Sequence, residues 1–158
     1  MAARLDRATV PWRLGGGTGR LLLGLPGRPT DIDIEVAARD AVRAAALLGL
    51  PHPAPTDGGG WSSLRSQGWL AGVDVDLSGG LRVEGPGGVL LADDARTAVV
   101  PFGAGTIRVE APGEALARAV VAGDAAREQR ARHLLPDDPA EALAYAELRI
   151  ATAASAAR

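Results

Sequence analysis

Cysteine and lysine are both missing from this chain of 158 residues. Without cysteine, the chain has no disulfide framework, no thiolate zinc site and no thiol nucleophile. Without lysine, it has no P-loop lysine, no Schiff-base lysine and no serine–lysine catalytic pair. The use of arginine throughout, together with many alanines and glycines, indicates a GC-rich genome rather than a particular chemistry.

Other features are also lacking, and each narrows the choice of partners. The formal net charge is only −2, so the chain has no basic excess and nucleic acid is not favoured as a partner. It has no run of about 18 apolar residues that could span a membrane. Its start, MAARLDRATV, lacks the apolar region of a signal peptide. We therefore expect a cytoplasmic protein with no membrane partner, in which residues 1–158 form a single domain.

Acidic and apolar residues alternate in the segment TDIDIEVA. This pattern places Asp31, Asp33 and Glu35 on one side of a strand, because a β-strand with one apolar and one polar face has a period of two. Asp74 and Asp76 alternate in the same way in the segment GVDVDL. If the two strands are neighbours in one sheet, their carboxylates repel one another unless a cation lies between them. Mg²⁺ suits such oxygen ligands and usually keeps partners such as substrate phosphates.

A glycine turn precedes the first acidic strand. Residues 10–14, VPWRL, predict a short strand that ends at three glycines, and residues 18–23 predict a short helix capped by Thr18. A glycine turn at the start of a helix lets phosphate approach backbone N–H groups, where the helix dipole favours anions. The glycines fit neither a Rossmann G-x-G-x-x-G nor a P-loop, because Arg20 stands at the third glycine position and no lysine follows.

Taken together, the glycine turn, the Asp-x-Asp strand and the distant acidic strand resemble the DNA polymerase β-like nucleotidyltransferase superfamily. The signature of that superfamily is matched here by Gly16-Gly17, by Asp31-Ile32-Asp33 and by Val73-Asp74-Val75. More narrowly, the stretch WRLGGGTGRLLLGLPGRPTDIDIEV is similar to the small lincosamide and aminoglycoside nucleotidyltransferases. The resemblance implies an α/β (α+β) fold, with a small mixed sheet backed by helices over residues 1–111 and a short helical C-terminal part over residues 112–158.

The resemblance also implies roles for the acidic residues. Asp31 and Asp33 would bind Mg²⁺. Asp74 would be the third acidic residue, which binds metal or acts as general base on the acceptor hydroxyl. Asp76 lies two residues further on and could exchange roles with Asp74. Glu35 is interpreted as a surface residue.

The phosphate-binding residues implied by the resemblance come from the glycine turn and the loop after it. Gly16, Gly17 and Thr18 would hold the triphosphate, and Arg28 would steady phosphate charge in the transition state. Arg20 is a second candidate from its position alone. The loop before Asp31 is shorter than in the family.

The activity implied is transfer of a nucleoside monophosphate, AMP from ATP, to a hydroxyl of a small molecule, with release of pyrophosphate. Mg²⁺ is the implied cofactor, ATP or another nucleoside triphosphate the co-substrate, an antibiotic the nearest acceptor, and a homodimer the implied assembly. One alternative is a toxin–antitoxin nucleotidyltransferase that modifies a protein or a tRNA. Another is a non-catalytic member that binds nucleotide or a partner, which the short loop favours and the full set of carboxylates opposes.

The remaining segments predict elements that surround this site. We expect a helix over 40–48 that ends at Gly49, a flexible stretch over 51–60, and a strand over 72–77 that is broken by Gly79 and Gly80. The arginine-rich run over residues 127–132 is interpreted as a solvated helix face, and Trp61 as a packing residue. Further short strands are expected at 61–64, 68–70, 81–83, 89–91, 98–100 and 106–110, and helices at 113–134 and 138–155.

Overall fold

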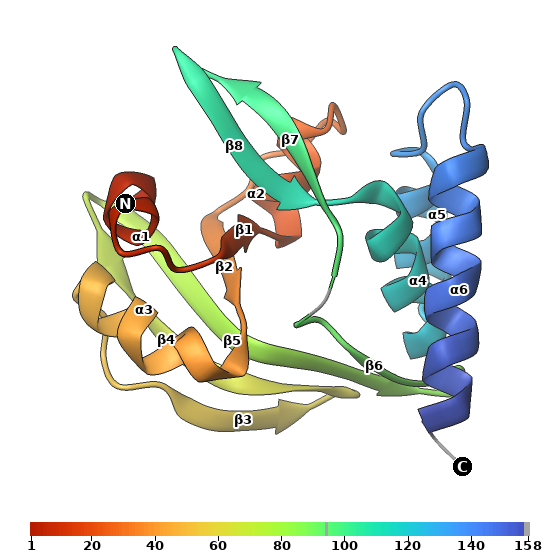
Figure 1. Cartoon of the computed structure of the whole chain (residues 1–158), viewed down its shortest axis with the longest axis horizontal. Coiled ribbons are helices and arrows are strands. Elements are labelled where there is room, and N and C mark those ends of the chain that lie inside the picture. Colours follow the sequence, from red (N-terminus) through yellow and green to blue (C-terminus); the bar gives the residue numbers. More distant parts are fainter. Residues whose placement is uncertain (94, 157–158) are drawn as a thin grey trace.

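The computed structural model describes residues 1–93 and 95–156 (Figure 1). Its helices are α1 (Ala2–Arg7), α2 (Gly16–Leu22), the 3₁₀ turn η1 (Ala38–Asp40), α3 (Ala41–Leu48), α4 (Pro112–Ala122), α5 (Ala125–Arg132) and α6 (Ala140–Ala156). Its strands are β1 (Trp12–Leu14), β2 (Asp31–Val36), β3 (Ala54–Gly58), β4 (Trp61–Leu70), β5 (Val73–Gly85), β6 (Gly88–Leu91), β7 (Thr97–Phe102) and β8 (Gly105–Glu110). None of the described helices has both the length and the apolar character to cross a membrane.

All the described strands belong to one mixed sheet, which confirms the predicted fold class. The strand order is β3-β4-β5-β2-β1-β8-β7, and β6 pairs with β5 beside this path. The β2–β5 and β1–β8 pairs are parallel, and the other pairs are antiparallel. Helices α1 and α3 lie at one end of the molecule and α4, α5 and α6 at the other (Figure 1).

The two acidic segments are strands, as their alternation predicted, and they are neighbours in the sheet, as the family resemblance implied. Strands β2 and β5 pair in register, so that Asp31 lies opposite Asp74 and Asp33 lies opposite Asp76. Side chains of paired residues project from the same face of a sheet. The carboxylates of both strands therefore share one face.

Two hydrophobic clusters hold the sheet, and β5 belongs to both. The first cluster lies around α1, α3 and the first half of β5, and it includes Leu5, Leu48 and Leu77. The second lies around α4, α6 and the far half of β5, and it includes Val83 and Leu116. Each buried aliphatic side chain of this size stabilises the fold by about 1.5–3 kcal/mol. The long strand thus fixes the C-terminal helices relative to the acidic face.

The predicted break in β5 is wrong, and the reason is close packing. Gly79 and Gly80 lie within the strand, where added Cβ atoms would overlap the side chains of Ala41 and Ala38. The glycines let α3 and η1 approach the sheet and do not end the strand. The neighbouring β4 is likewise one continuous strand rather than two, and the stretch expected to be flexible contains β3.

The long helix predicted over residues 113–134 is divided in two. Gly123 ends α4 with a φ of 69°, and Asp124 caps α5 by accepting a hydrogen bond of 2.9 Å from the backbone N–H of Arg127. The predicted end of α3 at Gly49 is confirmed, with a φ of 74°. Helix α1 was not predicted, since its short segment has little hydrophobic periodicity.

Candidate functional site

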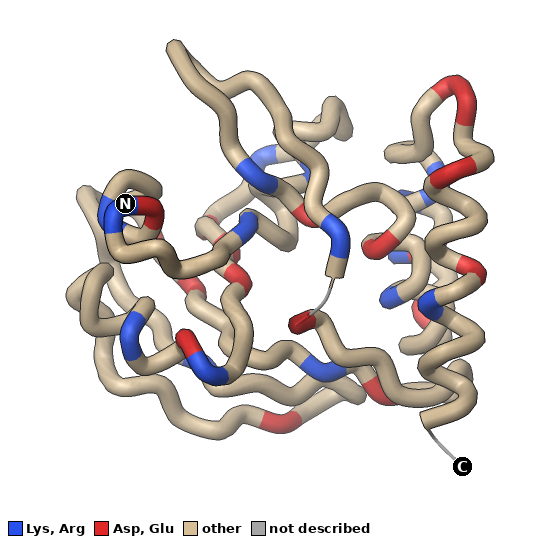
Figure 2. The backbone as a smooth tube through the Cα atoms, viewed as in Figure 1, with Lys and Arg blue, Asp and Glu red and all other residues tan. Residues whose placement is uncertain are grey.

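A cavity of about 890 Å³ lies between the acidic face of β2 and β5, helix α2 and the C-terminal helices. Acidic positions mark the central strands, and arginines mark the side of α4 and α5 (Figure 2). The acidic residues that line the cavity are Asp31, Asp33, Glu35, Asp57, Asp76 and Glu110. The basic ones are Arg20, Arg28, Arg65, Arg118, Arg127 and Arg130.

Asp31 and Asp33 come from the start of β2, and both are partly buried. Burial is the main cause that raises the pKa of Asp33, and the negative charges of Asp31 and Asp76 raise it further. A hydrogen bond from the backbone N–H of Gly17 lowers it in part. Crowded carboxylates of this kind are stabilised by a cation, which removes their mutual repulsion.

The glycine turn brings the backbone directly against this pair. Gly16 has a φ of 53°, and a Cβ added to it would overlap the carboxylate of Asp33. Helix α2 begins at Gly16 with Gly15 as its N-cap, so the prediction that Thr18 caps the helix is wrong. The Thr18 hydroxyl instead donates a hydrogen bond of 2.8 Å to the carbonyl oxygen of Asp31, and this bond ties α2 to the start of β2.

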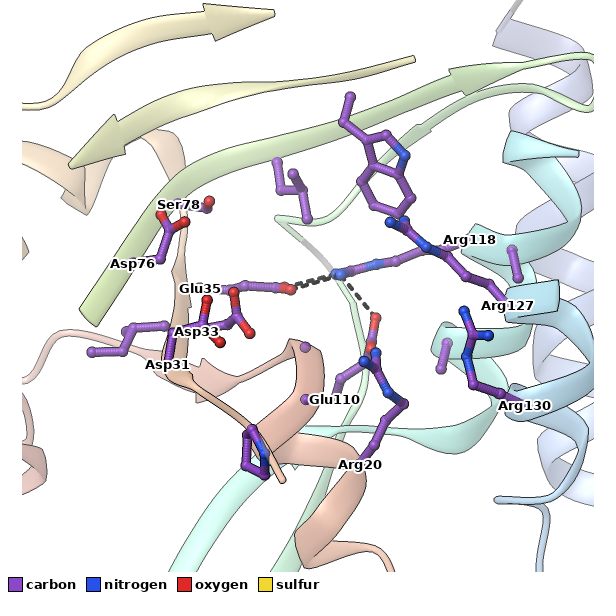
Figure 3. Close-up of a pocket in the computed structure, with 18 of the residues that line it drawn as sticks. Arg20, Asp31, Asp33, Glu35, Asp76, Ser78, Glu110, Arg118, Arg127 and Arg130 are labelled. Atoms are coloured by element: carbon purple, nitrogen blue, oxygen red, sulfur yellow. Dashed lines mark hydrogen bonds and ion pairs between the residues drawn. The ribbon is translucent and has the colours of Figure 1, made fainter. Parts of the chain in front are cut away.

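The two candidates for the third carboxylate lie in different places. Asp74 is exposed and lies outside the large cavity, in a second depression of about 420 Å³ that Trp69 also lines. Asp76 is 7% exposed and lines both cavities, as Asp31 does. In the large cavity the structure therefore places Asp76, and not Asp74, beside Asp31 and Asp33 (Figure 3).

Asp76 is already held by an arginine. Arg65 Nε lies 2.9 Å from Asp76 Oδ1 and 2.8 Å from Oδ2, and Arg65 Nη2 also donates to Oδ2. Gln67 Nε2 approaches the same oxygen at 3.3 Å. The hydrogen bond to Asp76 raises the pKa of Arg65, and the charges of Asp33 and Asp31 raise it further. The guanidinium thus lies within the field of all three carboxylates.

The donor set fits one divalent ion better than a larger metal centre. Within residues 1–93 and 95–156, no three carboxylate or imidazole groups are arranged to hold a metal ion together. Two carboxylates completed by water and phosphate oxygens are an ordinary Mg²⁺ site, and Asp31 and Asp33 are the pair that could supply them. Asp76 fits poorly as a third ligand, because its carboxylate is already paired with the Arg65 guanidinium, although Oδ1 accepts only one of these hydrogen bonds.

Glu35 lies in a buried ionic network in the wall of the cavity, so its interpretation as a surface residue is wrong. Arg118 Nη1 and Nη2 lie 2.7 and 2.8 Å from its two oxygens, and Arg13 Nε donates at 2.9 Å. Burial alone would raise the Glu35 pKa, but the charges and hydrogen bonds of Arg118 and Arg13 outweigh it and bring the pKa to about 2. Glu35 is buried because α4 brings Arg118 over the end of β2 (Figure 3).

Glu110, at the end of β8, was not singled out in the sequence. The Glu110 side chain is almost fully buried. Its Oε1 atom lies 2.8 Å from Arg118 Nη1, but this atom has no hydrogen-bond partner of good geometry among the described residues. Burial is the main cause that raises its pKa to about 7, and the charges of Glu35 and Glu114 add to the rise against the effect of Arg118. The cavity therefore has a carboxyl in its wall that titrates near neutral pH.

Arginines form the wall opposite the acidic strands. Arg127 and Arg130 project from α5 towards the cavity (Figure 3), and both are exposed, so their helix face is solvated as predicted and also faces the cavity. The Arg127 guanidinium lies 4.7 Å from the centre of the Trp61 ring, so Trp61 lines the cavity as well as packing. Arg20, Arg28 and Arg130 make no ion pair with any residue that the structure describes. The i, i+3 spacing of Arg127 and Arg130 is a sequence signal that could have placed them together.

No protein-family model matches the sequence, and no curated protein is significantly similar to it. A Thermotoga maritima protein, whose own assignment as a nucleotidyltransferase is provisional, superimposes with a TM-score of 0.60 at 20% identity, over 68% of this chain and 71% of that one. The antibiotic-resistance factor ANT(2'')-Ia superimposes with a TM-score of 0.51 at 14% identity, over 98% of this chain and 85% of that one. The lincosamide antibiotic adenylyltransferase LnuA, solved with lincomycin bound, superimposes with a TM-score of 0.50 at 13% identity, over 92% of this chain and 91% of that one. The chain therefore has the nucleotidyltransferase fold that its glycine turn and acidic strands predicted.

Proposed function

We propose that this chain is a metal-dependent nucleotidyltransferase that transfers AMP from ATP to a hydroxyl of a small molecule and releases pyrophosphate. The observation that carries the proposal is the arrangement of one cavity, in which Asp31, Asp33 and Asp76 face a wall of arginines. We propose an antibiotic as the acceptor, because two proteins of the same fold are an antibiotic-resistance factor and a lincosamide antibiotic adenylyltransferase.

The two walls of the cavity suit the two ends of a metal–nucleotide complex. Asp31 and Asp33 would hold Mg²⁺, which polarises the α-phosphate and draws charge from the leaving pyrophosphate when it is bound. Arg20, Arg28 and Arg130, which make no ion pair among the described residues, would neutralise the triphosphate, which carries more negative charge than one divalent ion offsets. The acidic end and the basic end of the cavity thus orient the nucleotide in one direction.

The glycine turn has a positioning role in this proposal. Gly16 lets the backbone pass beside Asp33, and the Gly17 N–H donates to that carboxylate. Thr18 holds the start of β2 through the Asp31 carbonyl oxygen. Both contacts fix the carboxylates that bind the metal before the nucleotide arrives, and catalysis depends on such fixed geometry.

The third carboxylate would receive the proton of the acceptor hydroxyl. Asp76 suits this role because it lies opposite Asp33 and lines both the large cavity and the depression that holds Trp69. An acceptor in that depression would reach the α-phosphate past Asp31, which also lines both spaces. Asp74 lies at the outer side of the same depression and would contact the acceptor there.

Pyrophosphate release tests the proposal. The purified chain is incubated with Mg²⁺, each of the four nucleoside triphosphates in turn, and a panel of lincosamides and aminoglycosides. We expect release that needs metal, nucleotide and acceptor together, and that falls by at least about 100-fold in Asp33→Asn. Glu147→Gln, on the exposed side of α6, is the matched carboxylate control and keeps full activity. Asp33→Asn that releases pyrophosphate at the control rate would contradict the proposed site.

A second candidate function is nucleotide binding without turnover. The observation that favours it is the Arg65 fork, which occupies the oxygens of the third carboxylate. Calorimetric titration with ATP and Mg²⁺ separates the two candidates. Metal-dependent binding with no pyrophosphate release for any acceptor supports the second, and acceptor-dependent release supports the first.

A further inference from the structure

Arg65 and Asp76 are held together by the sheet itself. Strands β4 and β5 are antiparallel, with Gln67 opposite Asp76 and Arg65 opposite Ser78. Arg65 therefore reaches Asp76 as a diagonal neighbour on the same face, which is within the reach of a long side chain. The contact involves no loop, and its carboxylate is almost completely buried, whereas the arginine side chain is 41% exposed.

The pair changes the charge that a metal ion meets at the acidic wall. Asp31, Asp33 and Asp76 together carry a formal charge of −3, and Arg65 reduces it to −2. One divalent ion neutralises the remainder. A second divalent ion would meet a carboxylate whose oxygens already accept hydrogen bonds from Arg65 and Gln67, and it would have to displace a forked, charge-assisted contact.

We propose that Arg65 is a built-in cation that takes the place of a metal ion on Asp76, so that this chain binds a single divalent ion through Asp31 and Asp33. Arg65 is then a positioning residue, because it holds the third carboxylate towards the cavity and outside the metal site. The inference rests on the proposed function only for the identity of the site, since metal binding is measured without turnover.

Mn²⁺ binding tests the inference, with the free ion counted by electron paramagnetic resonance. The wild type is expected to bind one Mn²⁺ per chain, and Asp33→Asn to bind at least about tenfold more weakly because a ligand is lost. Arg65→Gln frees Asp76 and is expected to bind a second Mn²⁺. Arg65→Lys restores the charge and is expected to return the count to one.

Two further variants separate ligation from simple charge effects. The double variant Arg65→Gln/Asp76→Asn removes the pair without changing the net charge, and it is expected to bind one Mn²⁺ with an affinity within about twofold of the wild type. Arg82→Gln is the matched control, because it removes an exposed arginine that pairs with Glu84 on strand β5, next to the strand of Arg65. It is expected to leave the number of bound Mn²⁺ ions at one. Thermal unfolding of every variant checks that it is folded.

Each contrary outcome overturns the inference. It is wrong if the wild type binds two Mn²⁺, if Arg65→Gln still binds one, or if the double variant loses binding as Asp33→Asn does. Failure of the proposed function looks different: the wild type binds one Mn²⁺ and the Arg65 series behaves as expected, but no nucleotide and acceptor together release pyrophosphate. A wild type that binds no Mn²⁺ at all overturns both.

Discussion

Replacing Glu110 by glutamine should stabilise the protein at neutral and alkaline pH. The Glu110 carboxyl is buried against Arg118 and close to Glu35 and Glu114, and its pKa rises from 4.5 to about 7 on folding. In the unfolded chain this carboxyl ionises freely in water. The folded state therefore holds its proton more tightly than the unfolded state between about pH 4.5 and pH 7.

The direction and the size of the change in stability with pH follow from this difference in pKa between the folded and unfolded states. Because the folded pKa is raised, Glu110 favours folding least above pH 7, and the wild type loses stability as the pH rises through that window. The full loss is on the order of 3 kcal/mol, at about 1.4 kcal/mol for each pKa unit. Glutamine has the same shape and cannot ionise, so Glu110→Gln avoids the loss. The opposite contribution of Glu35, whose pKa is lowered, is lost only as the pH falls below about 4.5 towards 2 and lies outside this window.

Urea unfolding of both proteins at several values between pH 5 and pH 8 measures the effect. The free energy of unfolding of Glu110→Gln should exceed that of the wild type by a margin that grows by about 2–3 kcal/mol across this range. Glu147→Gln, with an exposed carboxyl on α6, is the control whose margin stays constant. A constant margin for Glu110→Gln, or a variant less stable than the wild type at pH 8, would refute the burial argument.

Three further predictions follow from single contacts. Gly16→Ala should lose about 1–3 kcal/mol of stability in urea and also weaken Mn²⁺ binding, because its Cβ overlaps Asp33, whereas Gly49→Ala, with a positive φ and open space, should lose stability alone. Arg130→Gln should leave the unfolding free energy within about 0.5 kcal/mol of the wild type but raise the KM for ATP several-fold, and Arg132→Gln, which loses an exposed pair with Glu128, should not raise it. Arg118→Met should destabilise by about 3–5 kcal/mol in the same assay, because buried carboxylates lose their partner.

The parts of the site that the sequence predicted are those with a local pattern. The alternation around Asp31 and Asp74 predicted two strands with acidic faces, and the parallel pairing of β2 and β5 confirms it. Gly49 after an apolar helix predicted where α3 ends. In each case the cause lies within a few residues of its effect, so a short stretch of sequence contains the whole signal.

The parts that the sequence could not predict depend on contacts between distant segments. Glu35 pairs with Arg118, which lies 83 residues away, and no local pattern connects them. Gly79 has the sequence appearance of a strand breaker, but its role is to admit Ala41 against the sheet. Arg65 was not singled out, because an arginine on an amphipathic strand has the same local pattern whether it faces water or a buried aspartate.

The long strand β5 explains why these distant contacts converge on one cavity. Its first half carries Asp76 and packs Leu77 into the cluster around α3, and its far half packs Val83 under the C-terminal helices. Its last residue, Gly85, lies so close to α4 that a Cβ there would overlap the backbone of Val121. The acidic wall and the helix that carries Arg118 are therefore attached to the same strand. Since Arg118 also holds Glu35 on β2, the spacing between the carboxylates and the arginine wall is set by packing on both sides of the cavity and does not depend on a mobile loop.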